Sequence, residues 1–100
     1  MCMVKKFESG GEIYYSVKDI YKIINCYTRN EKIIFSVEFF QIVDEKIIPY
    51  TNLLSIDSET LYDEEKQISE NIARCNGFIE QCLKKCYDTI SELYFVCVTS

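Results

Sequence analysis

The sequence contains no histidine and no tryptophan, and it has one proline, three glycines and a single alanine. The absence of histidine excludes Ser-His-Asp and Cys-His catalysis, a histidine general base and a histidine-ligated zinc site. The only adjacent glycines, Gly10 and Gly11, belong to neither a G-x-G-x-x-G nor a Walker pattern, so no phosphate-binding loop is expected. We therefore expect no enzyme activity, and no metal or other cofactor.

Long apolar runs are also missing. Residues 1–7 have no apolar stretch behind their lysines, so they do not read as a signal peptide. The longest apolar runs are far shorter than the roughly 20 residues that span a bilayer. We expect a soluble cytoplasmic protein, in the cytoplasm of the host cell if the chain is viral. In that compartment the six cysteines are expected to be free thiols that pack as small hydrophobes.

The composition is that of a globular protein, with 48% hydrophobic and 27% charged residues. Its length predicts a single domain, residues 1–100. The net charge of −5 argues against direct nucleic-acid binding and favours a protein partner with a basic surface. Fourteen isoleucines and nine lysines against two arginines are typical of an AT-rich genome, such as that of a low-GC bacterium or its phages.

The part of the chain before Ser55 is rich in β-branched and aromatic residues. We predict strands at residues 3–7, 13–17, 32–42 and 46–56, with turns at Gly10-Gly11 and at residues 43–45. Residues 19–28 fit either a helix behind Ser16 as a cap or a further strand, and the strand propensity of isoleucine and tyrosine favours the strand. The result is an antiparallel β-meander of four or five strands. Residues 94–98 also have strand chemistry and are expected at a sheet edge or frayed.

Beyond Ser55 the apolar residues recur at helical spacing. We predict a helix over about residues 58–92, roughly 50 Å long, with Asp57 or Ser58 as its cap. Asn76-Gly77 is a helix-stop signal, so a helix pair broken there is the alternative, but the apolar phase continues across it. The predicted fold is therefore α+β, an N-terminal antiparallel meander with a long C-terminal helix or helix pair packed on one face.

Two clusters in the sequence have side chains that can bind metal ions, the cysteines of the helical stripe and the acidic residues between positions 57 and 65. Cys75, Cys82 and Cys86 share one helix face, but they lie on the same stripe as buried-type isoleucines and are interpreted as core. The acidic residues between positions 57 and 65 lack the EF-hand spacing and its glycine. We interpret them as a solvated helix start that can also serve as an acidic docking patch.

The favoured function is that of a small acidic protein-binding module that acts by occlusion, for example a phage or mobile-element inhibitor of a host nuclease or anti-phage defence complex. The residues proposed for the interface are sheet tyrosines and acidic helix-start residues, because exposed tyrosine is enriched at protein interfaces: Tyr14, Tyr15, Tyr21, Tyr27, Asp63, Glu64 and Glu65.

Two other functions stay open. One is a structural or assembly subunit that forms a homodimer through its C-terminal helix, because a 50 Å helix would overhang a small sheet and leave its apolar stripe uncovered. The self-association residues of that stripe are Ile68, Ile72 and Ile79. The other is a small-molecule binder or an enzyme that works with carboxylates.

Overall fold

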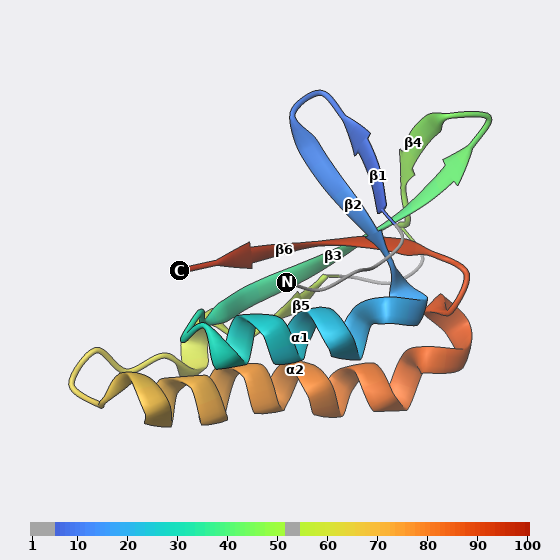
Figure 1. Ribbon diagram of the computed structural model, residues 1–100. Coiled ribbons are helices and arrows are strands. Elements are labelled where there is room, and N and C mark those ends of the chain that lie inside the picture. The colour runs from blue at the N-terminus through green and yellow to red at the C-terminus, as the bar shows by residue number, and fades with distance from the viewer. Residues whose placement is uncertain (1–5, 52–54) are drawn as a thin grey trace.

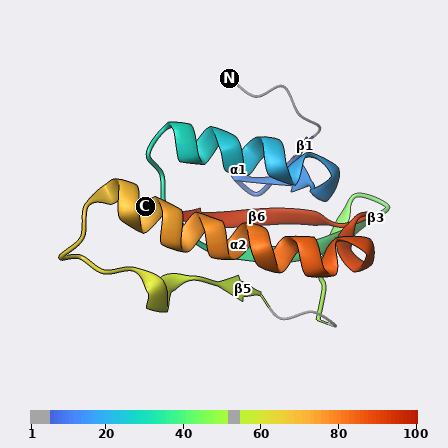
Figure 2. The same cartoon turned by 90° about the horizontal axis from the view of Figure 1, so that it is seen from below.

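The protein has two layers, an antiparallel sheet and two α-helices that lie side by side on one of its faces (Figures 1 and 2). The computed structural model describes residues 6–51 and 55–100, which form β1 (Lys6–Ser9), β2 (Glu12–Ser16), the 3₁₀ helix η1 (Val17–Asp19), α1 (Ile20–Arg29), β3 (Ile34–Val43), β4 (Lys46–Pro49), β5 (Ile56–Asp57), the 3₁₀ helix η2 (Glu59–Leu61), α2 (Ile68–Ile90) and β6 (Tyr94–Thr99). The α+β fold class, with a long C-terminal helix on one face of the sheet, is confirmed. Residues 3–5 of the predicted first strand lie outside the described residues.

Strand β6 lies in the middle of the sheet. The strand order is β1-β2-β6-β3-β4, with β5 also paired to β3, and all pairs are antiparallel. The expectation that the last segment would be frayed or at an edge is wrong, because Phe95 of β6 is fully buried in the core between sheet and helices. Strands β2 and β3 are therefore joined through β6 and are not direct neighbours.

Residues 19–28 form a helix, so the strand predicted there is wrong. The helix α1 buries Ile20, Ile23 and Ile24 on one face, and Val17 of η1 continues that face. The hydroxyl of Ser16 accepts a hydrogen bond from the Lys18 N–H at 3.3 Å, which makes Ser16 the cap of η1. The 3–4 residue spacing of the apolar positions outweighed the strand propensity of the individual residues.

Helix α2 is continuous through Asn76 and Gly77, so the helix-pair alternative is ruled out. It starts at Ile68, ten residues later than predicted, and its 23 residues span about 35 Å. Ser58 does not cap it, because the buried Ser58 hydroxyl donates to the Ile34 carbonyl at 2.5 Å instead. Asp57 accepts a hydrogen bond from the Glu59 N–H at 2.8 Å and so supports only the short helix η2.

Asn76 connects the helices to the sheet. Its side-chain oxygen accepts from the Ile34 N–H at 2.9 Å, and its amide group donates to the Thr28 hydroxyl at 3.0 Å and to the Lys32 carbonyl at 3.1 Å. Asn76 is almost fully buried and thus joins α2 to the end of α1 and the start of β3. Asn76, which the sequence suggested as part of a helix stop, instead lies inside α2 and holds the two layers together.

The strand predicted at residues 46–56 is divided into two strands, β4 and β5. Strand β4 ends at Pro49, and β5 pairs with the opposite end of β3, through Val37 and Ile56. Residues 52–54 lie outside the described residues. Both two-residue hairpin turns occur as predicted, with positive φ at Gly10 and Gly11 and at Asp44 and Glu45.

Candidate interaction surface

The cysteines of the helical stripe behave as core residues. Cys75 is fully buried and its thiol donates to the Ser58 carbonyl, while Cys82 and Cys86 pack against the core cluster. Burial, reinforced by Cys82, raises the pKa of the Cys86 thiol, and burial raises the pKa of Cys97 to about 12. Thiols with raised pKa values are poor nucleophiles at neutral pH. Within residues 6–51 and 55–100, no three His, Cys, Asp or Glu side chains are placed to hold a metal ion.

Cys26 corrects the expectation of six free thiols. It is disulfide-bonded, whereas Cys75, Cys82, Cys86 and Cys97 are free. The absence of a recognisable signal peptide was the whole basis for expecting free thiols, and that absence carries no information about the pairing of an individual cysteine.

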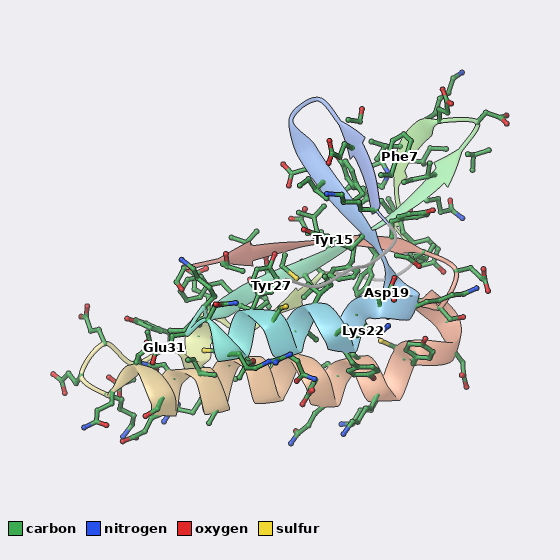
Figure 3. All side chains as sticks on the ribbon, viewed as in Figure 1. Phe7, Tyr15, Asp19, Lys22, Tyr27 and Glu31 are labelled. Carbon is green, nitrogen blue, oxygen red and sulfur yellow. The ribbon has the colours of Figure 1, made fainter. Side chains whose placement is uncertain are left out.

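The four tyrosines proposed for an interface are not brought together. Tyr15 packs on Phe95 with ring centroids 5.9 Å apart, and Tyr21 stacks on Tyr87 at 6.1 Å. Burial raises the pKa of Tyr27 to about 12. Figure 3 shows Tyr15 and Tyr27 close to the junction of sheet and helices, where both contact the core cluster. Only Tyr14 lies on the sheet face that points away from the helices.

The acidic trio lies in the loop between η2 and α2. Asp63 is held there by Asn71, which accepts from the Asp63 N–H and donates to the Asp63 carbonyl, both at 2.9 Å. Its carboxylate accepts from the Glu65 N–H at 3.0 Å, so Asp63 has a structural role in the loop. Glu64 and Glu65 are exposed. This loop lies at the end of the molecule opposite the two hairpins (Figure 1).

The proposed self-association residues differ in accessibility. Ile68 is 47% exposed and Ile72 is half-buried, but Ile79 is fully buried in the core of its own chain. A seam between two copies therefore has to be built from Ile68 and Ile72. Helix α2 is about 35 Å long, shorter than the roughly 50 Å from which the overhang was argued.

Two hairpins project from the sheet away from the helices and form separate arms (Figure 1). We call residues 6–14, from β1 and β2, the first arm, and residues 40–49, from β3 and β4, the second arm. Tyr14 of the first arm meets Phe40 of the second in an edge-to-face contact with ring centroids 5.1 Å apart. Phe7 pairs with Tyr14 across the first arm and so shares its face (Figure 3).

The arms also expose large aliphatic side chains. Val43 is 50% exposed, Ile48 is 45% exposed and Ile13 is 36% exposed. Sequence reasoning missed these three and also Phe40. The available signal was the segment at residues 39–43, which has no small or charged residue on either face, whereas an isolated hairpin would be expected to have one polar face.

The arms carry an acidic excess. Their carboxylates are Glu8, Glu12, Asp44 and Glu45, against the two lysines Lys6 and Lys46, which gives a net charge of −2 for residues 6–14 and 40–49. Lys6 is 3.4 Å from Glu8, so that pair compensates itself. Glu38 lies at the base of the second arm and is exposed. Its neighbours Val37 and Phe39 are buried in the core, so Glu38 points to the sheet face away from the helices, because side chains alternate along a strand.

Of the helices in the described ranges, none is long and apolar enough to cross a membrane. In comparisons with known proteins, the chain matches no family model, no curated protein and no solved structure.

Proposed function

We propose that the protein is a binding module that attaches to another protein through its two arms and acts by covering part of that partner's surface. The observation that carries the proposal is the exposure of Ile13, Val43 and Ile48 on hairpins that stand apart from the core. Large aliphatic side chains that remain accessible on a small protein are typical of interaction sites. A binding role is also supported by the raised pKa values of the Cys86 and Cys97 thiols and by the absence of histidine, because nucleophilic catalysis commonly uses a reactive thiolate or a histidine base.

The partner is proposed to have a basic surface. The whole chain has a net charge of −5, and the arms contribute −2 of it. A positive partner surface would speed the encounter with these arms, and added salt would weaken binding because mobile ions screen exposed charges.

The origin and compartment are part of the proposal. The AT-rich composition, small size and acidity support an inhibitor that a phage or mobile element produces in the host cytoplasm, directed at a nuclease or an anti-phage defence complex. The disulfide at Cys26 argues against the cytoplasm, since disulfides persist mainly in oxidising compartments. Alkylation of the protein in intact expressing cells, followed by mass spectrometry, separates the two: a Cys26 peptide alkylated without reductant supports the cytoplasm.

The function is tested by capture and titration. Immobilised protein is incubated with extracts of candidate hosts, and the captured protein is identified, purified and titrated with the chain. We expect a stoichiometric complex in which the partner's activity is blocked and whose affinity falls as salt is added.

A matched pair of variants locates the contact. Val43→Ser with Ile48→Ser removes the exposed aliphatic side chains of the second arm, and Phe78→Ser removes a side chain of α2 that is 37% exposed. The arm variant should lose binding and the α2 variant should retain it. The proposal fails if no host protein is bound, or if Phe78→Ser abolishes binding while the arm variant does not.

A second candidate function is assembly through α2. It is favoured by Ile68, which is exposed at the first turn of α2, with Ile72 one turn further on. Analytical ultracentrifugation should show a dimer that Ile68→Asp with Ile72→Asp converts to a folded monomer. A wild-type protein that is monomeric at high micromolar concentration excludes this function.

A further inference from the structure

Strand β3 has two successive partners along the edge that faces away from β6. Strand β4 pairs with it as far as Phe40, opposite Pro49, and β5 pairs with it from Val37 on. The Tyr50 N–H adds one more hydrogen bond, to the Phe39 carbonyl at 3.0 Å. Where the chain passes from one partner to the other, the surface has a hollow of about 370 Å³, which we call the β3 hollow.

The lining of the β3 hollow combines rings with one charged group. Phe40, Pro49 and Tyr50 contribute the rings, and Glu38 contributes the only charged side chain of the lining. The volume lies near the lower end of the range for ligand pockets, which is about 300–1,000 Å³. The hollow therefore suits one side chain of a partner better than an extended segment.

Glu38 also stands out on the sheet face opposite the helices, which carries no second layer in the described part of the chain (Figure 1). The residues that β3 and β6 place on this face lie in three register pairs: Ser36–Val98, Glu38–Val96 and Phe40–Tyr94. Glu38 is the only charged residue among these six. Its side chain is thus a single negative charge in a largely apolar surface.

The Glu38 carboxylate has no basic partner in residues 6–51 and 55–100. No lysine or arginine nitrogen of these residues lies within 4 Å of it. Its neighbours Phe40 and Val96 keep other polar groups at a distance, and an ion pair becomes stronger where apolar groups exclude water. A cation that brings apolar or planar surface of its own would therefore find its charge partner already in place.

We propose that the β3 hollow receives an arginine side chain of the partner protein. This inference rests on the proposed binding function and names its anchoring contact. A guanidinium group is planar and weakly hydrated, forms two parallel hydrogen bonds with a carboxylate, and stacks on aromatic rings. Glu38 offers the carboxylate, and Phe40 and Tyr50 offer the rings. Lysine would form the ion pair but would match the rings less well.

An anchor in the β3 hollow is continuous with the second arm. Phe40 belongs both to the lining and to the arm, and the exposed Val43 lies three residues further along β3, about 10 Å away. One partner surface can therefore cover both features. Arginine is among the residues that contribute most to binding when they fill a pocket inside such an interface.

The probe is a capped valine–arginine–valine peptide, titrated into the full chain and followed through the backbone amide signals by NMR. A citrulline peptide keeps the shape and removes the charge, and a lysine peptide keeps the charge and removes the planar group. We expect saturable shift changes at residues 38–40 and 50–51 with a dissociation constant of about 1 mM for the arginine peptide. The lysine peptide should bind about threefold more weakly, and the citrulline peptide should not saturate.

A matched pair of variants assigns the binding to Glu38. Glu38→Gln removes the charge at nearly the same size, and Glu65→Gln makes the same change in net charge in the loop before α2. Both residues are exposed, so both variants should melt as wild type does. We expect the arginine peptide to bind Glu38→Gln about fivefold more weakly, and Glu65→Gln within about twofold of wild type.

Three results of these titrations would overturn the proposal. The arginine peptide may give no saturable change up to about 10 mM, the citrulline peptide may bind as well as the arginine peptide, or both variants may lose affinity equally. The first means that the hollow does not hold this side chain. The second removes the ion pair as the cause, and the third shows that only the overall charge of the chain attracts the peptide.

The outcome for this inference is separable from that for the function. A captured host protein that binds Glu38→Gln as tightly as wild type, but not the Val43→Ser with Ile48→Ser variant, leaves the binding function standing and removes the arginine anchor. Failure to capture any host protein removes the function and the partner's arginine with it. If the arginine peptide still binds in that case, the β3 hollow is a site for a free guanidinium compound.

Discussion

The helix-covered body of the protein and its two arms are held together by different means. In the body, fully buried side chains from both layers form one core, and buried Asn71 and Asn76 have hydrogen-bond partners. No buried side-chain nitrogen or oxygen in the described ranges lacks a partner. The arms rely on hairpin ladders and the Tyr14–Phe40 contact, and they expose Val43 and Ile48. We therefore expect the body to be the more stable region, and the proposed binding surface lies on the arms, where we expect the lower local stability.

The largest loss of stability is expected at Asn76, which joins the helices to the sheet. Asn76→Ala removes three hydrogen bonds and leaves the buried Ile34 N–H without its acceptor, so we expect a loss of about 3 kcal/mol in the free energy of unfolding. Urea denaturation measures it. Asn25→Ala, at an exposed position of α1, is the control and should change stability by about 0.5 kcal/mol or less. Equal effects from the two would mean that Asn76 is not the joint between the layers.

The arms should respond to loss of their ring contact. Tyr14→Ala, Phe40→Ala and the double variant form a thermodynamic cycle, and we expect a coupling of about 1 kcal/mol from an edge-to-face pair of half-buried rings. Amide hydrogen exchange should speed up in residues 6–14 and 40–49 while α2 stays protected. If protection in α2 falls as much as in the arms, the two regions are not energetically distinct.

Gly77 allows the body to be strengthened without touching the arms. A Cβ at Gly77 meets nothing within 4 Å, and the hollow of about 210 Å³ beside it, between α1 and α2, is lined by Ile24 and Ile72 among others. Gly77→Ala should therefore stabilise the protein by up to about 1 kcal/mol, because alanine has the better helix propensity. A higher melting temperature with unchanged exchange in the arms is the expected result. Destabilisation would indicate that α2 needs glycine there.

The smallest change in stability at neutral pH is expected from two buried ionisable groups of the body, Tyr27 and Cys97. The folded-state pKa of Tyr27 is raised to about 12 from 10.0, and that of Cys97 to about 12 from 9.0, both by burial. A raised folded pKa contributes stability below the unfolded value that is lost as pH rises through the folded one. Stability should thus fall between about pH 9 and 12. Tyr27→Phe should lessen the fall above pH 10, because it removes the phenol whose pKa is raised. A profile that stays flat to pH 12 would contradict the burial of both groups.

The parts of the fold that local patterns determine were predictable. The two hairpin turns follow from their residues, and the heptad-like phase correctly indicated that α2 runs through Gly77. The α1 segment was mispredicted because residue propensities were weighed above the spacing of Ile20, Ile23 and Ile24. The start of α2 was misplaced because the Ser58 hydroxyl bonds to Ile34, which lies 24 residues away in sequence.

The candidate surface was predicted less well than the fold. Four tyrosines were assigned to the sheet, but Tyr21 and Tyr27 belong to a helix, and Tyr15 faces the core. The accessibility of Ile13, Val43 and Ile48 depends on where β2 and β3 part from β6. That is a long-range property of the sheet, and the periodicity of a single strand does not contain it.

The central position of β6 has a consequence for how the chain is made. Tyr15 and its partner Phe95 are about 80 residues apart, so the first hairpin leaves the ribosome long before the strand that attaches it to the rest of the sheet. Contacts that close such long loops slow folding. Until β6 is translated, the first hairpin and β3 each have an unpaired strand edge. Chaperone capture during synthesis should therefore depend on these edges, because they expose backbone groups that β6 later occupies.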